Sequence, residues 1–69
     1  MPDETTYEIC LENMLDEKWA AFFKPFTLVV NTHTTSLIGN VHDQAELFGV
    51  LLKIRDLGLT LISVNPLRR

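Results

Sequence analysis

The chain has 69 residues, 46% of them hydrophobic, which is enough for one domain, residues 1–69, and for no more. Six Lys and Arg against nine Asp and Glu give a net charge of -3, which argues against binding a nucleic-acid backbone, because such binding depends on neutralising phosphates. The longest apolar run is far below the roughly 20 residues that a membrane span requires, and the N-terminus lacks a signal-peptide pattern. The composition therefore predicts a cytoplasmic protein with neither nucleic acid nor membrane as partner.

The small size predicts marginal stability for a single copy. A domain of this length buries only about 60% of the surface that its unfolded chain exposes, and such domains often add disulfides, a metal or a partner subunit. The single cysteine, Cys10, excludes an internal disulfide and suits a reducing compartment. We therefore expect a homo-oligomer, either a dimer or a larger assembly.

The first third of the chain changes from a strand pattern to a helix pattern. Residues 1–5 are polar and expected to be disordered, whereas residues 6–12 alternate apolar and polar, as a half-buried strand does. Four apolar residues then recur at helical spacing and predict one helix face: Leu15, Trp19, Phe22 and Phe23. Asn13 or Asp16 can cap this helix, and Pro25 ends it.

The middle of the chain predicts a β-hairpin. Residues 26–31 and 35–41 are rich in β-branched and apolar residues, and the polar residues 31–34 form a plausible loop between them. Gly39 falls on the inward face of the second strand. A glycine there often marks the close approach of another element, which we expect to be a helix packed above the sheet.

The second helix has the clearest signals. Asp43 can cap its start, with Glu46 three residues later as in a capping box, and Gly58 follows its end in the position of a left-handed residue. Its apolar residues predict one broad buried stripe: Leu47, Val50, Leu51, Ile54 and Leu57. A last strand is expected over residues 60–65, with Pro66 ending it.

The order of these elements, β-α-β-β-α-β, is that of the split βαβ or ferredoxin-like fold. Right-handed crossovers place both helices on one face of a four-stranded antiparallel sheet, which gives an α+β sandwich of two layers. An alternative treats residues 1–25 as a loosely attached arm on a β-β-α-β unit.

The segment 43–64, DQAELFGVLLKIRDLGLTLISV, resembles a small uncharacterised bacterial family whose members carry a "DQA…LL.KIRDLGL.L.SV" segment near the C-terminus. Three upstream stretches are also similar to the family pattern: residues 7–9, Trp19 with Phe23, and residues 35–41. The resemblance implies a complete, free-standing small protein and no particular activity, because the family has no established one. Many relatives carry a histidine where this chain has Phe48.

Side chains with catalytic or metal-binding chemistry are few and scattered. Cys10, His33 and His42 lack the paired spacings of zinc sites, and the three glycines form no phosphate-binding loop. We therefore expect no catalytic residue, no metal, no cofactor and no enzymatic activity. An enzyme would require His42, Asp43 or Cys10 to meet in a pocket across a dimer interface.

Two surfaces are candidates for contact with a partner. The sheet face without helices is expected to carry Val29, Ile38, Cys10 and either Ile62 or Val64, a mixture too apolar to be left fully solvated. The second helix carries a further apolar stripe away from its core residues: Ala45, Phe48 and Leu52, flanked by Gln44 and Arg55. This stripe either packs against the first helix through Ala20 and Phe23 or forms a contact surface with Phe48 as its anchor.

The sequence thus predicts a non-enzymatic domain that acts by self-association and protein contact, with a possible unidentified protein partner. The candidate surface residues are Gln44, Phe48, Leu52, Arg55, Val29 and Ile38. The alternative is a small-molecule-sensing regulatory module with its ligand at a dimer interface, which rests on fold analogy.

Overall fold

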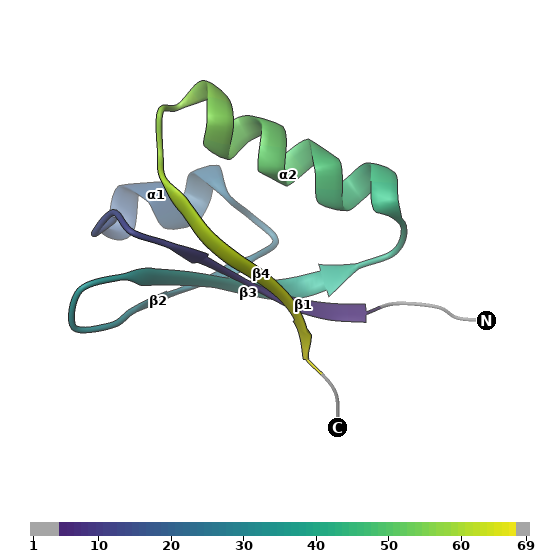
Figure 1. Ribbon diagram of the computed structural model, residues 1–69, viewed down its shortest axis with the longest axis horizontal. Helices are drawn as coiled ribbons and strands as arrows, with labels where there is room; N and C mark the ends of the chain where they lie inside the picture. The colour runs from purple at the N-terminus through teal and green to yellow at the C-terminus, as the bar shows by residue number, and fades with distance from the viewer. Residues whose placement is uncertain (1–4, 68–69) are drawn as a thin grey trace.

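The computed structural model describes residues 5–67 and contains four strands and two helices. In chain order they are β1 (Thr5–Leu11), α1 (Glu17–Phe22), β2 (Thr27–Val30), β3 (Thr35–Val41), α2 (Gln44–Asp56) and β4 (Leu61–Leu67). The sheet has the order β2-β3-β1-β4 with every pair antiparallel, and both helices lie on one of its faces (Figure 1). The predicted ferredoxin-like α+β sandwich is therefore confirmed.

The first strand is central to the sheet. β1 pairs with β3 on one side and β4 on the other, and its inward residues Ile9 and Leu11 are fully buried. The interpretation of residues 1–25 as a loose arm is therefore wrong. Thr5, expected in the disordered segment, is the first residue of β1, and the expectation for residues 1–4 lies outside the described residues.

Helix α1 is shorter than its apolar pattern suggests. Asp16 caps it by accepting a hydrogen bond from the Lys18 backbone N–H at 3.1 Å, and the helix has only six residues. Leu15 reaches the core from the preceding connection, and Phe23 reaches it from the C-terminal cap. Phe22 is 47% exposed, so the prediction of one buried face shared by all four apolar residues is wrong there.

Gly39 permits a close approach, but the approaching group is not a helix. A Cβ atom on Gly39 would lie 2.9 Å from the Phe26 ring, which belongs to the segment between α1 and β2. Phe26 is buried and belongs to the core cluster with Leu37 and Val50. Thr27, the first residue of β2, pairs with Ile38 of β3, so Phe26 lies beside Gly39. The glycine therefore leaves space for the Phe26 ring.

Both predicted ends of α2 are confirmed. Asp43 accepts from the Glu46 N–H at 2.9 Å, and the last turn closes with hydrogen bonds from Gly58 to Arg55 and from Leu59 to Ile54, with Gly58 at φ 75°. This is the Schellman arrangement, which satisfies two terminal carbonyls. Three residues of the predicted stripe are buried against the sheet: Leu47, Val50 and Ile54.

The two edges of the sheet are short or interrupted. β2 has four residues, and β4 runs through Pro66 to Leu67, so Pro66 does not end the strand as predicted. Proline is tolerated there because an outer strand can leave one N–H position unpaired. The pairing of β1 and β4 also shifts at Leu11, which leaves Ile62 without an opposite residue. These features disfavour the addition of another strand.

Replacing Gly39 and Gly49 with alanine should have opposite effects on stability. Gly39→Ala places a methyl group against Phe26, and we expect a loss of about 1–3 kcal/mol in the free energy of unfolding. Gly49→Ala meets nothing within 4 Å and should stabilise helix α2 by about 0.5–1 kcal/mol. Urea denaturation of both variants tests this, and equal shifts would contradict the packing of Phe26 on Gly39.

Candidate interaction surface

The apolar stripe on the outer side of α2 is exposed. Phe48 is 55% and Leu52 is 48% accessible, although both are large apolar side chains in the middle of a helix. At about 100° per residue, Gln44, Phe48, Leu52 and Arg55 fall within about 80° of the helix circumference. The four predicted helix residues therefore lie on one side of α2, and we call them the outer stripe.

The outer stripe does not pack on α1. Lys53 of α2 contacts α1 instead: its Nζ lies 5.3 Å from the centroid of the exposed Phe22 ring. Phe23, the predicted partner of the stripe, is instead buried in the core and stacks near Trp19, with 6.2 Å between ring centroids. The alternative in which α1 covers the outer stripe is therefore wrong, because Phe48 and Leu52 remain exposed.

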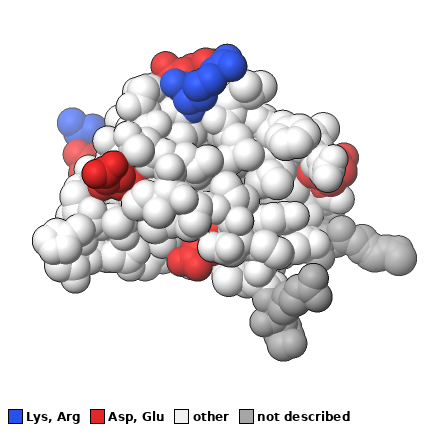
Figure 2. Space-filling view, in the orientation of Figure 1, with Lys and Arg blue, Asp and Glu red and all other residues white. Residues whose placement is uncertain are grey.

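Charged side chains lie toward the margins of the face formed by α2 and β4. Figure 2 shows an uncharged expanse across the middle of this face, with acidic and basic groups around it. One of the charged groups is an exposed ion pair at the end of α2, in which Arg55 Nη2 lies 3.1 Å from Asp56 Oδ1. Charged residues are likewise depleted from the centre of protein contact surfaces and lie at the rim.

The start of α2 is held by three neighbouring residues. Glu46 Oε1 accepts from the His42 backbone N–H at 2.6 Å and lies 3.1 Å from His42 Nδ1. These hydrogen bonds, first from the backbone and then from the ring, hold the pKa of Glu46 below its ordinary value of 4.5, although the nearby Asp43 opposes the shift. The capping box differs from the predicted one, because Glu46 reaches the N–H of His42.

The open face of the sheet carries the predicted Val29, Ile38 and Cys10 among polar side chains. Val29 is 38% exposed and lies in the same cross-strand row as Cys10, because both pair with Ser36. Ile38 is half-buried and pairs with Glu8 of β1. Val64 is opposite Ile9 and packs against the core, so it does not add to this face. With Glu8 at its centre and Ser63 and Asn65 beside it on β4, this face is the weaker of the two candidate surfaces.

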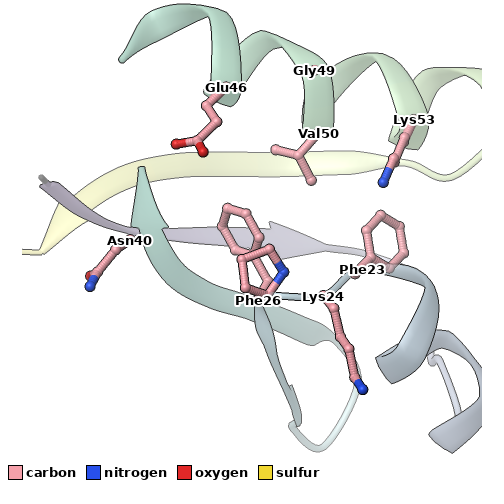
Figure 3. A pocket seen from close by; sticks show the side chains of 9 residues that line it. Phe23, Lys24, Phe26, Asn40, Glu46, Gly49, Val50 and Lys53 are labelled. Atoms are coloured by element: carbon pink, nitrogen blue, oxygen red, sulfur yellow. The ribbon is translucent and has the colours of Figure 1, made fainter. Parts of the chain in front are cut away.

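A groove separates α2 from the segment that follows α1. Its volume is about 280 Å³, and Figure 3 shows Glu46, Val50 and Lys53 above it on α2, with Phe23 and Phe26 below. Gly49 leaves space on the helix side, because nothing lies within 4 Å of where its Cβ would be. The groove can accommodate a small apolar molecule with a polar end, although its volume is at the lower limit for such sites.

Residues with reactive or metal-binding side chains do not gather at one place. Within residues 5–67, no group of three or more His, Cys, Asp or Glu side chains could hold a metal ion. Cys10 is a half-buried free thiol on β1, His33 is at the hairpin loop, and His42 contacts Glu46. The structure therefore does not bring Cys10 and His42 together within one copy of the chain.

Sequence reasoning missed the groove and the exposure of Leu61, whereas Ile62 was one of its two alternatives for an exposed residue of the last strand. Leu61 and Ile62 at the start of β4 are 43% and 52% exposed. The available signal for the groove was Gly49, a glycine inside a helix that needs no unusual backbone angle. The available signal for β4 was its pair of consecutive apolar residues, since a strand can direct only one of two neighbours inward.

Residues 6–65 match the family described as Domain of unknown function (DUF8691). The chain belongs to this family. No curated protein and no solved structure matches the chain. The family membership agrees with the expected resemblance to an uncharacterised family and assigns no activity to the outer stripe or to the groove.

In the part of the chain that the structure describes, no helix is long and apolar enough to cross a membrane. The longer helix, α2, has 13 residues and carries charged side chains in its first and last turns.

The capping carboxylate of Glu46 should contribute to stability in a pH-dependent way. Because its pKa is lowered in the folded state, its contribution is present above the ordinary value of 4.5 and is lost as the pH falls through the lower native value. Glu46→Gln should therefore be less stable than the wild type at pH 7, and the difference should shrink below pH 4.5. Urea midpoints across this range test the prediction, with the exposed Glu12→Gln as control. A difference that stays constant with pH would contradict it.

Proposed function

We propose that this protein acts by self-association and protein contact through the outer stripe of α2, without catalysis. The observation that carries the proposal is the exposure of Phe48 and Leu52 side by side on a helix whose opposite side is buried. A large aromatic anchor with an arginine at its edge is the combination enriched in the energetic centres of protein contacts. The lone half-buried Cys10 supports a reducing compartment, so the proposed location is the cytoplasm.

The small core supports the same proposal. Ten hydrophobic residues are buried, whereas ten large hydrophobic side chains among residues 5–67 are exposed. Burying part of that exposed surface against another chain would stabilise the fold by about 25 cal/mol for each Å² of apolar area removed from water. A second copy of the chain is the simplest source of such a surface. Self-association would make the free energy of unfolding depend on protein concentration.

The sheet edges favour contact through a face over contact through strand addition. β2 is short, and β4 carries Pro66 and an irregular pairing with β1. An added strand would lose hydrogen bonds at these points. The side chains of α2 have no such restriction, which supports the outer stripe as the contact surface.

Sedimentation equilibrium tests the proposal. The wild type should form a dimer or larger assembly at micromolar concentration, and Phe48→Glu should shift it toward the monomer, because burying an unpaired carboxylate is costly. Val29→Glu is the matched control, since it places the same charge on the other candidate surface. A wild-type protein that remains monomeric would overturn the proposal, and dissociation by Val29→Glu alone would move the interface to the open face of the sheet. Circular dichroism confirms that each variant is folded.

The groove supports a second candidate, a small-molecule-binding module. The specific observation is the space beside Gly49, which has the apolar Phe26 below it and Val50 above it, with the charged Glu46 and Lys53 on the same helix as Val50. Unlike the ligand site expected from the sequence, this one lies within a single copy.

A thermal-shift screen against amino acids and nucleotides tests this second candidate, because a molecule that binds the folded state raises the melting temperature. Any positive compound should also act on Ala21→Met, which changes an exposed residue of α1, and should lose its effect on Gly49→Met, which fills the groove. A shift retained in Gly49→Met would place the ligand elsewhere.

A further inference from the structure

We propose that the groove beside Gly49 binds a small apolar monocarboxylate, with the carboxylate at Lys53 and the apolar part extending past Gly49. The inference rests on the second candidate function, the small-molecule-binding module, and adds the chemical class and the orientation of its ligand. It follows from the lining of the groove and from the charges at its two ends.

The lining of the groove suits a short apolar group. Phe26 and Val50 line it as nearly buried side chains, and Pro25 lines it as an exposed one. Gly49 adds no side chain, and nothing lies within 4 Å of where its Cβ would be. The volume of about 280 Å³ equals that of about nine water molecules in the liquid. A benzene ring with a short acidic chain is therefore close to the largest ligand that fits.

The two ends of the groove carry opposite charges. Glu46 and Lys53 both line it from α2, and they lie on the same side of the helix about 10 Å apart along its axis. Glu46 is held at the start of α2 by the His42 N–H, and its lowered pKa keeps it ionised at neutral pH. An anionic group in the groove is therefore attracted to the Lys53 end and repelled from the Glu46 end.

The ammonium group of Lys53 is placed to receive a carboxylate. Figure 3 shows its side chain extending from α2 toward Phe23, whereas Lys24 on the other wall extends away from the helix. The contact of Lys53 Nζ with Phe22 involves the ring face, and an ammonium carries three N–H donors. Lys53 lies in the last turn of α2, where the helix dipole is negative. A carboxylate bound there therefore depends on the charge of Lys53.

The same charges discriminate among carboxylic acids. An α-amino acid carries its ammonium next to the carboxylate, so it would place a positive charge beside Lys53 and far from Glu46. A dicarboxylate of similar length would direct its second negative charge toward Glu46. Like charges at short distance repel. A monocarboxylate without an amino group is therefore the class that the groove favours.

NMR titration of the nitrogen-15-labelled protein tests the inference with three compounds that share one phenylpropyl skeleton. The acid, 3-phenylpropionate, should shift the amide signals of Phe26, Gly49 and Val50 saturably, with a millimolar Kd because the ligand is small. The neutral 3-phenylpropan-1-ol lacks the negative charge, and phenylalanine adds the α-ammonium. Both should bind about three- to fivefold more weakly, as expected for the loss of an exposed charge pair.

Matched lysine variants identify the charge that is responsible. Lys53→Met keeps an apolar stem and should weaken binding of 3-phenylpropionate about three- to fivefold, without changing the affinity for the alcohol. Lys18→Met removes the same charge from an exposed position of α1 outside the groove and should change neither affinity. Added salt should weaken binding of the acid and leave that of the alcohol unchanged.

The outcomes separate the inference from the second candidate function. Equal affinities for the acid and the alcohol, or for the acid and phenylalanine, would overturn the inference and leave the groove as a site for another class of ligand. Unchanged binding of the acid to Lys53→Met would also overturn it. If none of the three compounds shifts the groove signals, the inference is wrong. The second candidate fails as well only if the thermal-shift screen yields no compound whose effect is lost in Gly49→Met.

Discussion

The buried hydroxyl of Thr35 organises one end of the molecule. Thr35 is fully buried at the start of β3, where its Oγ1 donates to the Asn13 carbonyl at 2.8 Å and accepts from the Leu15 N–H at 3.0 Å. The Asn13 side chain accepts in turn from the Thr60 N–H at 2.7 Å. Thr35 thus fixes the connection after β1 and the position of Leu15, and Asn13 in that connection holds the residue before β4. The buried Thr35 hydroxyl has the partners that buried polar groups require.

This arrangement explains why so much apolar surface stays on the outside. The connection after β1 already supplies Leu15 to the core, and the cap of α1 supplies Phe23, so α1 itself remains short and covers little of the sheet. Helix α2 then buries one stripe against the sheet, while Phe48 and Leu52 of its outer stripe stay exposed and space remains beside Gly49. The apolar surface of α2 thus stays exposed because Leu15 and Phe23, from the segments on either side of α1, complete the core.

Local signals in the sequence predicted α2 well, because a cap at Asp43 and a left-handed glycine at position 58 each depend on a few adjacent residues. The central position of β1 was harder to predict, since its partners lie 24 to 36 positions away in β3 and 50 to 61 positions away in β4. Pro66 was interpreted as a strand end for the same reason: only the sheet order shows that β4 is an edge. The exposure of Phe48 and Leu52 could be proposed from helical spacing, whereas the absence of α1 beside them could not.

The proline in β4 has a consequence for whether the outer edge of the sheet can stack on identical strands. Stacking of identical strands into fibrils needs an uninterrupted row of backbone donors and acceptors along the outer strand. Pro66 removes one donor, and the unmatched Ile62 disturbs the spacing of the others. The outer strand β4 therefore lacks the uninterrupted row of backbone groups that stacking of identical strands requires.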